Sequence, residues 1–311
     1  MSLRIAVIGV GHLGKHHARI LSTLPGVTLV AAVDTNRARA AEVATANATE
    51  AAFDFRDVMG RVEAVTLAVP TERHLDVALP FLDAGIPVLV EKPMARSLAE
   101  ADAMIAASAK SGAILAVGHT ERFNPAVAAA RLLLTDPRFI EVHRLGTFPE
   151  RSLDIDVVFD LMIHDLDVVL SLVKSEVESI EAVGVPVLTG RVDIANARLR
   201  FANGCIVNLT ASRISRDRVR KIRFFQPSAY LSIDYAAQKI ERWTLVKGEA
   251  PMPVIEGGEV PVVNEEPLKR ELVDFVDAVV SRRPPMVTGL EGRRALALAQ
   301  AIAEKINATM Q

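Results

Sequence analysis

A glycine-rich segment near the start of the chain constrains the fold more than any other feature. Gly9, Gly11 and Gly14 form a Gly-x-Gly-x-x-Gly pattern that follows an apolar strand pattern at residues 3–8 and opens a predicted helix at residues 12–23. Such a turn lets the backbone approach a pyrophosphate closely, and the helix N-terminus offers N–H donors to phosphate. The pattern therefore predicts a dinucleotide-binding βαβ unit.

An acidic residue at the end of the next apolar run bears on the choice of dinucleotide. Asp34 follows the strand pattern at residues 28–33, where a carboxylate can accept hydrogen bonds from ribose hydroxyls and would repel a 2′-phosphate. Arg37 and Arg39 come shortly after and could partly accommodate such a phosphate, although a solvated helix face is the commoner role for them. We therefore expect NAD, with NADP less favoured.

The rest of the first 120 residues alternates short apolar runs with helical patterns. Strands are expected at 63–69, 86–91 and 113–117, and helices at 37–46, 72–84 and 97–110. Continuous apolar runs separated by helices indicate a parallel sheet that is covered on both faces. Residues 1–121 are therefore expected to form an α/β Rossmann domain with a doubly wound parallel sheet.

The pattern changes after about residue 120 and predicts a second domain. Helices are expected at 124–134 and 157–173, and strands at 138–148, 179–187, 192–201, 204–213, 219–226, 229–234 and 239–246. Residues 247–267 contain four prolines and three glycines and are expected to form a loop or an excursion at a sheet edge. Helices at 267–282 and 290–308 close the chain and could pack back on the first domain. Residues 122–311 are thus expected to form an α+β domain with an open, mostly antiparallel sheet.

Composition excludes several classes of protein. The 311 residues include 36 Lys+Arg and 38 Asp+Glu, so the charge gives no general case for binding nucleic acid or an anionic membrane. No apolar run approaches the ~20 residues needed to span a bilayer, and the first residues run directly into a strand pattern without a signal peptide. The single cysteine, Cys205, excludes an internal disulfide framework and is expected to be a small core residue. We expect a cytoplasmic protein.

Three motifs together resemble the Gfo/Idh/MocA family of oxidoreductases, and the resemblance covers essentially the whole chain. The motifs are the glycine-rich segment continued to His17, then Glu91-Lys92-Pro93, then Asp160-x-x-x-His164-x-x-Asp167. The resemblance implies a Rossmann domain followed by an open-sheet domain. It also implies NAD-linked oxidation of a secondary hydroxyl on a sugar, cyclitol or polyol, or the reverse reduction. Assembly into homodimers or homotetramers through the open sheet is implied as well.

The third motif supplies candidates for proton transfer. Hydride transfer from a carbinol carbon to nicotinamide needs a base for the hydroxyl proton, and the imidazole of His164 suits that task near neutrality. Asp160, four residues earlier, shares a helical face with His164 and could orient the imidazole or hold a substrate hydroxyl. Lys92 could be the base itself or polarise the reacting oxygen. We expect a proton path shared by Lys92 and His164, with His164 slightly favoured as the acid/base. A satisfied core histidine is the alternative reading of His164.

No metal is expected, because no further His or Cys cluster accompanies the third motif. Ligands of doubly wound sheets bind at the carboxyl ends of strands, and with the resemblance this implies a set of cofactor contacts. They are Gly9, Gly11, His12, Leu13, Gly14, Asp34, Thr35, Ala68, Val69, Pro70, Thr71, His74, Glu91, Lys92 and His119. His74 could equally be a surface residue at a helix terminus, and Pro93 could follow a cis peptide bond.

The expected substrate contacts are Lys92, Arg122, Asn124, Asp160 and His164. Asn124 could also serve as the N-cap of a helix with Pro125 at its first position. The strings at residues 119–125 and 156–165 resemble one branch of the family, the UDP-N-acetylglucosamine 3-dehydrogenases. That branch implies oxidation at C3 of the sugar and a partner aminotransferase. The Gly-Gly pair that precedes the family's helix is absent here, and residues 154–157 occupy its place.

Residues 213–223 carry six basic groups and one acid, and they could contact the diphosphate of a nucleotide sugar. A solvated hairpin or an oligomer interface paired with acids is the favoured reading of this segment. Two other functions remain open: a catalytically silent NAD-binding regulator, and a reductase for a non-sugar ring substrate. A silent regulator need not retain Lys92, Asp160 and His164, and this chain has all three.

Overall fold

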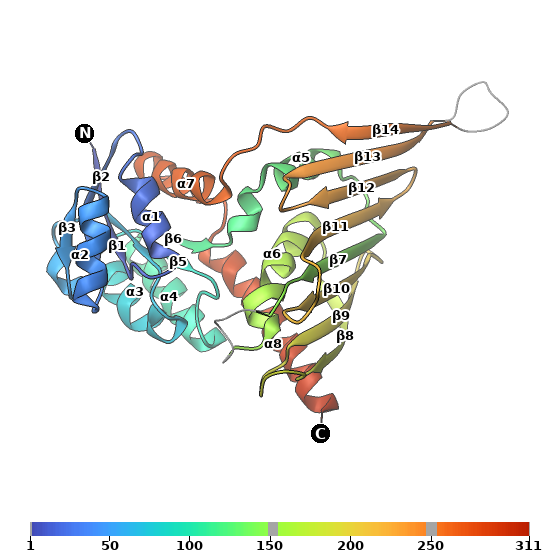
Figure 1. Ribbon diagram of the computed structural model, residues 1–311, viewed down its shortest axis with the longest axis horizontal. Helices are drawn as coiled ribbons and strands as arrows, with labels where there is room; N and C mark the ends of the chain where they lie inside the picture. The colour runs from blue at the N-terminus through green and yellow to red at the C-terminus, as the bar shows by residue number, and fades with distance from the viewer. Residues whose placement is uncertain (1, 149–154, 247–253, 311) are drawn as a thin grey trace. The chain divides into compact units, whose positions relative to one another are not determined.

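The computed structural model describes residues 2–148, 155–246 and 254–310, and its contacts divide the chain into two compact units. Unit 1 consists of Met1–Thr120 and Leu268–Leu296, and unit 2 consists of Glu121–Pro267 and Ala297–Gln311. Each unit is built on one sheet (Figure 1). The C-terminal segment thus contributes to both units.

The sheet of unit 1 has six parallel strands in the order β3-β2-β1-β4-β5-β6. The strands are β1 (Leu3–Ile8), β2 (Val27–Val33), β3 (Glu50–Ala52), β4 (Ala64–Leu67), β5 (Val88–Glu91) and β6 (Leu115–Gly118). The direction of winding reverses between β1 and β4, and the loops that leave these two neighbouring strands diverge at their carboxyl ends. Ligands of doubly wound sheets bind at such a switch point.

Helices cover both faces of this sheet. On one face, α1 (Gly14–Leu21), α2 (Arg37–Ala46) and α7 (Pro267–Ser281) share a buried core with the strands. On the other face lie α3 (His74–Asp83) and α4 (Leu98–Ser111), together with the start of α8 (Gly289–Thr309), whose Gly289 packs on Leu115 of β6. Leu272, Phe275 and Val276 bury one side of α7 in the core around β1, so residues from near the end of the chain complete the first unit.

The sheet of unit 2 has eight strands in the order β14-β13-β12-β11-β7-β10-β9-β8. They are β7 (Phe139–Leu145), β8 (Val177–Val185), β9 (Ile194–Phe201), β10 (Ile206–Ser212), β11 (Val219–Gln226), β12 (Ala229–Asp234), β13 (Lys239–Val246) and β14 (Val254–Val260). Neighbours pair antiparallel except β7 and β10, which are parallel. Burial alternates along β7 and β9, as expected for a sheet with one covered face.

One face of this sheet carries the helices of unit 2 (Figure 1). These are α5 (Pro125–Leu133), a π-helical segment at Val158–Met162, and α6 (Ile163–Leu172). The end of α8, from Ala297 on, also belongs to this unit, and its Ile306 packs on Gly184 of β8. None of the described helices covers the other face. No helix in the described part of the chain is long and apolar enough to cross a membrane.

The predicted fold class, a parallel doubly wound sheet plus an open, mostly antiparallel sheet, is confirmed. Three local expectations need correction. The helix expected over 157–173 begins as a π-helix, and the short strand β3 was not expected. Residues 254–260, inside the segment expected to be a loop or edge excursion, form the edge strand β14. Gly257 allows this pairing, since a Cβ there would lie 2.0 Å from the carbonyl oxygen of Arg242 on β13.

Candidate cofactor and catalytic residues

The glycine-rich turn of unit 1 is closely packed at two of its glycines and open at the third. Gly9 has φ +83°, and a Cβ on it would lie 2.7 Å from the backbone nitrogen of Val69. A Cβ on Gly14 would lie 1.8 Å from the carbonyl oxygen of Gly9, so the start of α1 can approach β1 only without a side chain. Apart from Gly11 itself and its two chain neighbours, no atom of the described structure lies within 4 Å of a Cβ built on Gly11. The turn therefore leaves open space at Gly11, and this space fits the pyrophosphate of a bound dinucleotide.

Asp34 stands at the carboxyl end of β2, beside this turn. Its Oδ2 accepts a hydrogen bond from the backbone N–H of Val10 at 3.1 Å, and its Oδ1 accepts one from Asn36 at 2.8 Å. Arg39 forms an ion pair with Asp34 at 3.3 Å, while the guanidinium of Arg37 stacks on the ring of Phe53, 4.4 Å from its centroid. The carboxylate is thus fixed at the strand end, where it can accept further hydrogen bonds from a ribose. These residues fit NAD.

His74 is a buried link between two loops and not a surface residue. It is 1 % exposed, and its Nε2 lies 3.0 Å from the carbonyl oxygen of Val69. Its Nδ1 lies 3.1 Å from the carbonyl oxygen of Pro93 and 3.3 Å from that of Met94. Burial lowers the pKa of His74, while these carbonyls and the charge of Glu91 act in the opposite sense. The surface alternative for His74 is therefore wrong, and the residue joins the loop after β4 to the loop after β5.

Glu91 and Lys92 lie at the carboxyl end of β5. The Oε1 of Glu91 is 3.0 Å from Nε2 of His17, and its Oε2 accepts a hydrogen bond from the backbone N–H of Lys92 at 3.2 Å. Burial alone would raise the pKa of Glu91, but the hydrogen bond and charge of His17, with Lys92, lower it overall. The peptide bond between Lys92 and Pro93 is cis. His17, the last residue of the first motif, therefore binds the first residue of the second.

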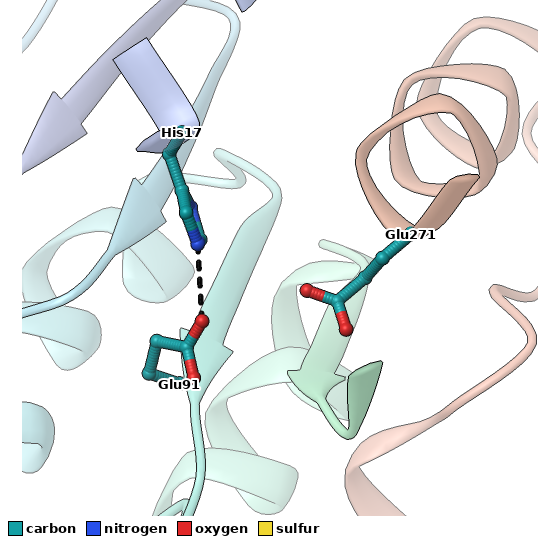
Figure 2. Close-up of side chains that lie close together, drawn as sticks. All are labelled: His17, Glu91 and Glu271. Carbon is teal, nitrogen blue, oxygen red and sulfur yellow. Dashed lines mark hydrogen bonds and ion pairs between the residues drawn. The ribbon is translucent and has the colours of Figure 1, made fainter. Parts of the chain in front are cut away.

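A third acidic group lies beside this pair. Glu271 projects from α7 toward His17 and Glu91, and ligand atoms of the three residues all lie within 4.8 Å of one another (Figure 2). Sequence reasoning missed Glu271, because only the return of α7 to the first sheet brings it near the motifs. Such a His/Glu/Glu group has the donor types of a metal site, although no metal was expected.

The remaining cofactor candidates of unit 1 differ in burial. His12 and Leu13 in the glycine-rich turn and Thr35 after β2 are exposed, whereas His119, directly after β6, is 1 % exposed. Ala68, Val69 and Pro70 form the loop after β4, and Thr71 begins the 3-10 helix Thr71–Arg73. Because β4 is the neighbour of β1 in the sheet, this loop lies beside the glycine-rich turn that follows β1.

The third motif lies where the π-helix passes into α6. Asp160, in the π-helix, and His164, in the first turn of α6, are both partly exposed. Asp165 and Asp167 are each 1 % exposed. Asp160 and His164 are thus partly exposed, whereas the other two acids are buried within unit 2. Residues 149–154, which include the start of the segment that replaces the family's Gly-Gly pair, lie outside the described residues.

Two buried arginines bind the two buried acids of α6. Arg122 makes a bidentate ion pair with Asp167 at 2.8 and 2.9 Å. Arg144, on β7, binds Asp165 through Nε at 2.6 Å and Nη2 at 3.0 Å, and also binds Glu121 at 3.0 Å. Sequence reasoning missed Arg144, which sits in an alternating strand at a position that otherwise faces the core.

Deep burial shifts the pKa values of the ionisable groups around Arg144. Burial raises the pKa of Asp165, although the charge and hydrogen bond of Arg144 lower it in part. Burial alone would lower the pKa of Arg144, but the charges of Asp165 and Glu121 raise it. Burial, together with the charge of Asp165, raises the pKa of Tyr235, whose ring lies 5.2 Å from the Arg144 guanidinium.

Asn124 serves as the predicted N-cap. Its Oδ1 accepts a hydrogen bond from the backbone N–H of Ala126 at 3.1 Å, and Pro125 occupies the first position of α5. Its Nδ2 donates to the carbonyl oxygen of Tyr235 at 3.0 Å, and Asn124 is 1 % exposed. The capping role is confirmed, and a role in binding substrate stays a prediction.

The basic segment at residues 213–223 is partly neutralised. Arg213 is buried and pairs with Asp193 at 2.8 Å, Lys221 pairs with Asp234 at 3.6 Å, and Arg223 pairs with Glu141 at 2.7 Å. The reading of a solvated hairpin is therefore wrong for Arg213, which is buried. An oligomer interface and a contact with a diphosphate stay predictions for the other basic residues of the segment. Cys205 is a buried free thiol, as expected, and burial raises its pKa to about 11.

Comparisons with known proteins place both halves of the chain in one family. The model for the Gfo/Idh/MocA oxidoreductase family with an NAD-binding Rossmann fold matches residues 3–119, and the model for the Gfo/Idh/MocA C-terminal domain matches residues 134–226. UDP-N-acetylglucosamine 3-dehydrogenase of Acidithiobacillus ferrooxidans is 37 % identical over 99 % of both chains. A solved structure of that enzyme matches with a TM-score of 0.95 at 36 % identity, covering 100 % of this chain and 99 % of the other.

A more distant relative is the scyllo-inositol 2-dehydrogenase (NAD(+)) of Bacillus subtilis, 29 % identical over 68 % of both chains. The structure of levoglucosan dehydrogenase in complex with NADH and levoglucosan matches with a TM-score of 0.89 at 19 % identity, covering 99 % of this chain and 98 % of the other. At that identity the match shows the shared fold.

Proposed function

Because the chain belongs to the Gfo/Idh/MocA family of NAD-binding oxidoreductases, we propose that it oxidises the C3 hydroxyl of UDP-N-acetylglucosamine or of a closely similar nucleotide sugar, with NAD rather than NADP. The observation that carries this substrate is the 37 % identity, over 99 % of both chains, with an enzyme named for that reaction. The reaction breaks the C3–H and O–H bonds of the alcohol and yields a 3-keto sugar, NADH and a proton.

Bound NAD supplies the hydride acceptor, and the chain supplies the acid/base groups. We assign the hydroxyl proton to a path shared by His164 and Lys92, with His164 as the favoured acceptor and Asp160 as the group that orients it or holds a neighbouring hydroxyl. The exposure pattern of the helix supports this assignment, since Asp160 and His164 are accessible while Asp165 and Asp167 are buried in ion pairs.

Arg122 and Asn124 are bound to other residues of unit 2. Arg122 pairs with Asp167, and Asn124 bonds to Ala126 and Tyr235, all within unit 2. We propose that they support the wall of the substrate pocket, and that direct recognition of the sugar falls mainly to Lys92, Asp160 and His164.

The outer face of the second sheet supports assembly into a homodimer or homotetramer. Phe139, Phe225 and Tyr230 form an aromatic row there with ring centroids 5.5 and 5.2 Å apart, and Trp243 on β13 is 40 % exposed. Contiguous exposed apolar groups of this kind mark association surfaces. Light scattering after size exclusion measures the oligomer.

We further propose that the 3-keto product passes to an aminotransferase.

Formation of NADH from UDP-N-acetylglucosamine tests the activity, and mass spectrometry of the 3-keto product tests the reacting group. An aminotransferase or a reverse assay with NADH removes the effect of an unfavourable equilibrium. Lys92→Ala and His164→Ala should each abolish turnover while NAD affinity by calorimetry stays within about twofold. Lys110→Ala, on an exposed position of α4, is the matched control.

Retained turnover in either variant would refute that residue's role. If the protein binds NAD but forms no NADH with any nucleotide sugar or polyol in either direction, the silent regulator replaces the enzyme as the better proposal.

A further inference from the structure

The buried group of His17, Glu91 and Glu271 combines residues of three elements of unit 1. His17 comes from α1, Glu91 from the end of β5 and Glu271 from α7 (Figure 2). Their exposed fractions are 0 %, 5 % and 1 %. The first two are joined by the 3.0 Å hydrogen bond, and Glu271 directs its carboxyl group toward both.

Two carboxyl groups this close in a dry interior cannot both carry an uncompensated negative charge. Compensation must come from a proton or a cation held within the group. The charged or titratable neighbours that face Glu91 are His17, Lys92 from its own segment, His74 from α3 and Glu271 from α7. Because ligand atoms of Glu271 lie within 4.8 Å of those of His17 and Glu91, the Glu271 carboxyl group is close enough to act on the His17 imidazole.

The carboxylate of Glu91 also bonds directly to the backbone of Lys92. Its Oε2 accepts the backbone N–H of Lys92, and its position is tightly bounded on the side of β6. A Cβ on Gly118 would lie 3.1 Å from Oε2 and 3.2 Å from Oε1 of Glu91. The carboxylate therefore lies flat against the neighbouring strand, and a change in its hydrogen bond to His17 alters the anchoring of the Lys92 backbone.

We propose that Glu271 is a positioning residue that fixes the orientation of His17 and, through the His17–Glu91 hydrogen bond, holds the segment that carries Lys92. The consequence for hydride transfer rests on the proposed function, whereas the effect on His17 does not. Helix α7 thereby contributes to the acid/base machinery of the first unit. Glu271 acts through His17 and Glu91, and no direct contact with substrate is required of it.

The experiment compares Glu271→Gln with Glu271→Asp and with Asp277→Asn, an exposed acid on the same helix. The first change keeps the shape and removes the charge, and the second keeps the charge and removes one methylene. Selective ¹⁵N labelling of histidine reads the ring nitrogens of His17, which are assigned by their loss in His17→Gln. Steady-state kinetics and calorimetry with NAD are measured on the same proteins, and thermal melting verifies folding.

Glu271→Gln should shift the ring-nitrogen resonances of His17 and lower kcat about 10-fold or more through misplacement of Lys92, with the Kd for NAD within about twofold. Glu271→Asp should keep the His17 resonances closer to those of the native protein and recover part of kcat. Asp277→Asn should match the native protein in every measurement. A role in packing alone predicts the reverse order, because the shortened Asp leaves a gap that the isosteric Gln does not.

Three results would overturn the proposal. One is an unchanged His17 spectrum and kcat in Glu271→Gln. Another is greater damage in Glu271→Asp than in Glu271→Gln. The third is a stoichiometric metal ion, found by elemental analysis of the native protein and lost in Glu271→Gln, which makes the group a cation site. If the native protein oxidises no nucleotide sugar, the His17 spectra still decide the role of Glu271, so the two failures are distinguishable.

Discussion

Replacing Asp165 by Asn tests how the helix of the third motif is anchored. The Asp165 carboxylate is 1 % exposed and receives two hydrogen bonds from the guanidinium of Arg144. Asn preserves the shape of the side chain, but it removes the negative charge and replaces one acceptor by a donor that would face the guanidinium. The change therefore leaves a buried cation without its main partner.

Breaking a buried ion pair by removing one partner costs about 3–5 kcal/mol. Here Glu121 still accepts a hydrogen bond from Arg144 at 3.0 Å, so we expect the lower end of that range. At roughly 2–4 °C per kcal/mol for a unit of this size, a loss of about 3 kcal/mol lowers the melting temperature of unit 2 by about 6–12 °C.

The single tryptophan makes the assay specific to the second unit. Trp243 lies on β13, so its fluorescence during urea or thermal unfolding reports on the sheet that carries Arg144. The control is Glu259→Gln, because its ion pair with Lys239 is exposed at both side chains and such pairs contribute about 1 kcal/mol or less. If Asp165→Asn shifts the Trp243 transition no more than the control does, the buried pair does not anchor the helix as argued.

Three further predictions concern unit 1. Gly14→Ala should abolish NAD binding in calorimetry and lower stability, because the new Cβ would lie 1.8 Å from the carbonyl oxygen of Gly9; retained binding would contradict the role of this turn. Asp34→Ser should weaken NAD and strengthen NADP binding, since it removes the ribose acceptor and releases Arg39 from its ion pair, and the ratio of the two Kd values measures the change. The pKa of Glu91 is lowered from 4.5, so its contribution to stability is present above pH 4.5 and is lost as the pH falls through the lower pKa of the folded state. Glu91→Gln should therefore flatten the pH dependence of the unfolding free energy in that window. An unchanged slope would contradict the assignment.

The sequence was most informative where local rules and global topology agree. The turn from Gly9 to Gly14 needs short-range features, a strand end, small residues and a helix start, and all of them lie within one stretch of chain. The succession of strand patterns from residue 179 to residue 246, with no helical pattern between them, likewise predicted an open, mostly antiparallel sheet. These patterns are local, and tertiary structure had only to preserve them.

Other features depend on contacts between distant segments, and no local pattern could indicate them. Glu271 occupies an ordinary amphipathic helix, and its function as a neighbour of His17 follows only from the return of α7 to the first sheet. Arg144 occupies a core-facing position of β7 and is tolerated there because Asp165 and Glu121 neutralise it. His74 was ambiguous because its partners are backbone carbonyls, which carry no residue-specific signal.

The helix of the third motif carries two kinds of polar residue, the proposed catalytic pair and two acids that are buried in ion pairs. Asp160 and His164 remain partly exposed, while the two acids that follow, Asp165 and Asp167, are fully engaged inside unit 2. The π-helical turn at Val158–Met162 changes the angular spacing just before α6, and extra residues of this kind are frequent at functional sites. Because Arg122 and Arg144, from two other segments, hold Asp167 and Asp165, we expect the orientation of His164 to depend on these two ion pairs. It follows that variants of Arg122 and Arg144 should reduce turnover through the geometry of His164, with the loss of activity accompanied by a loss of stability, whereas His164→Ala should reduce turnover at native stability.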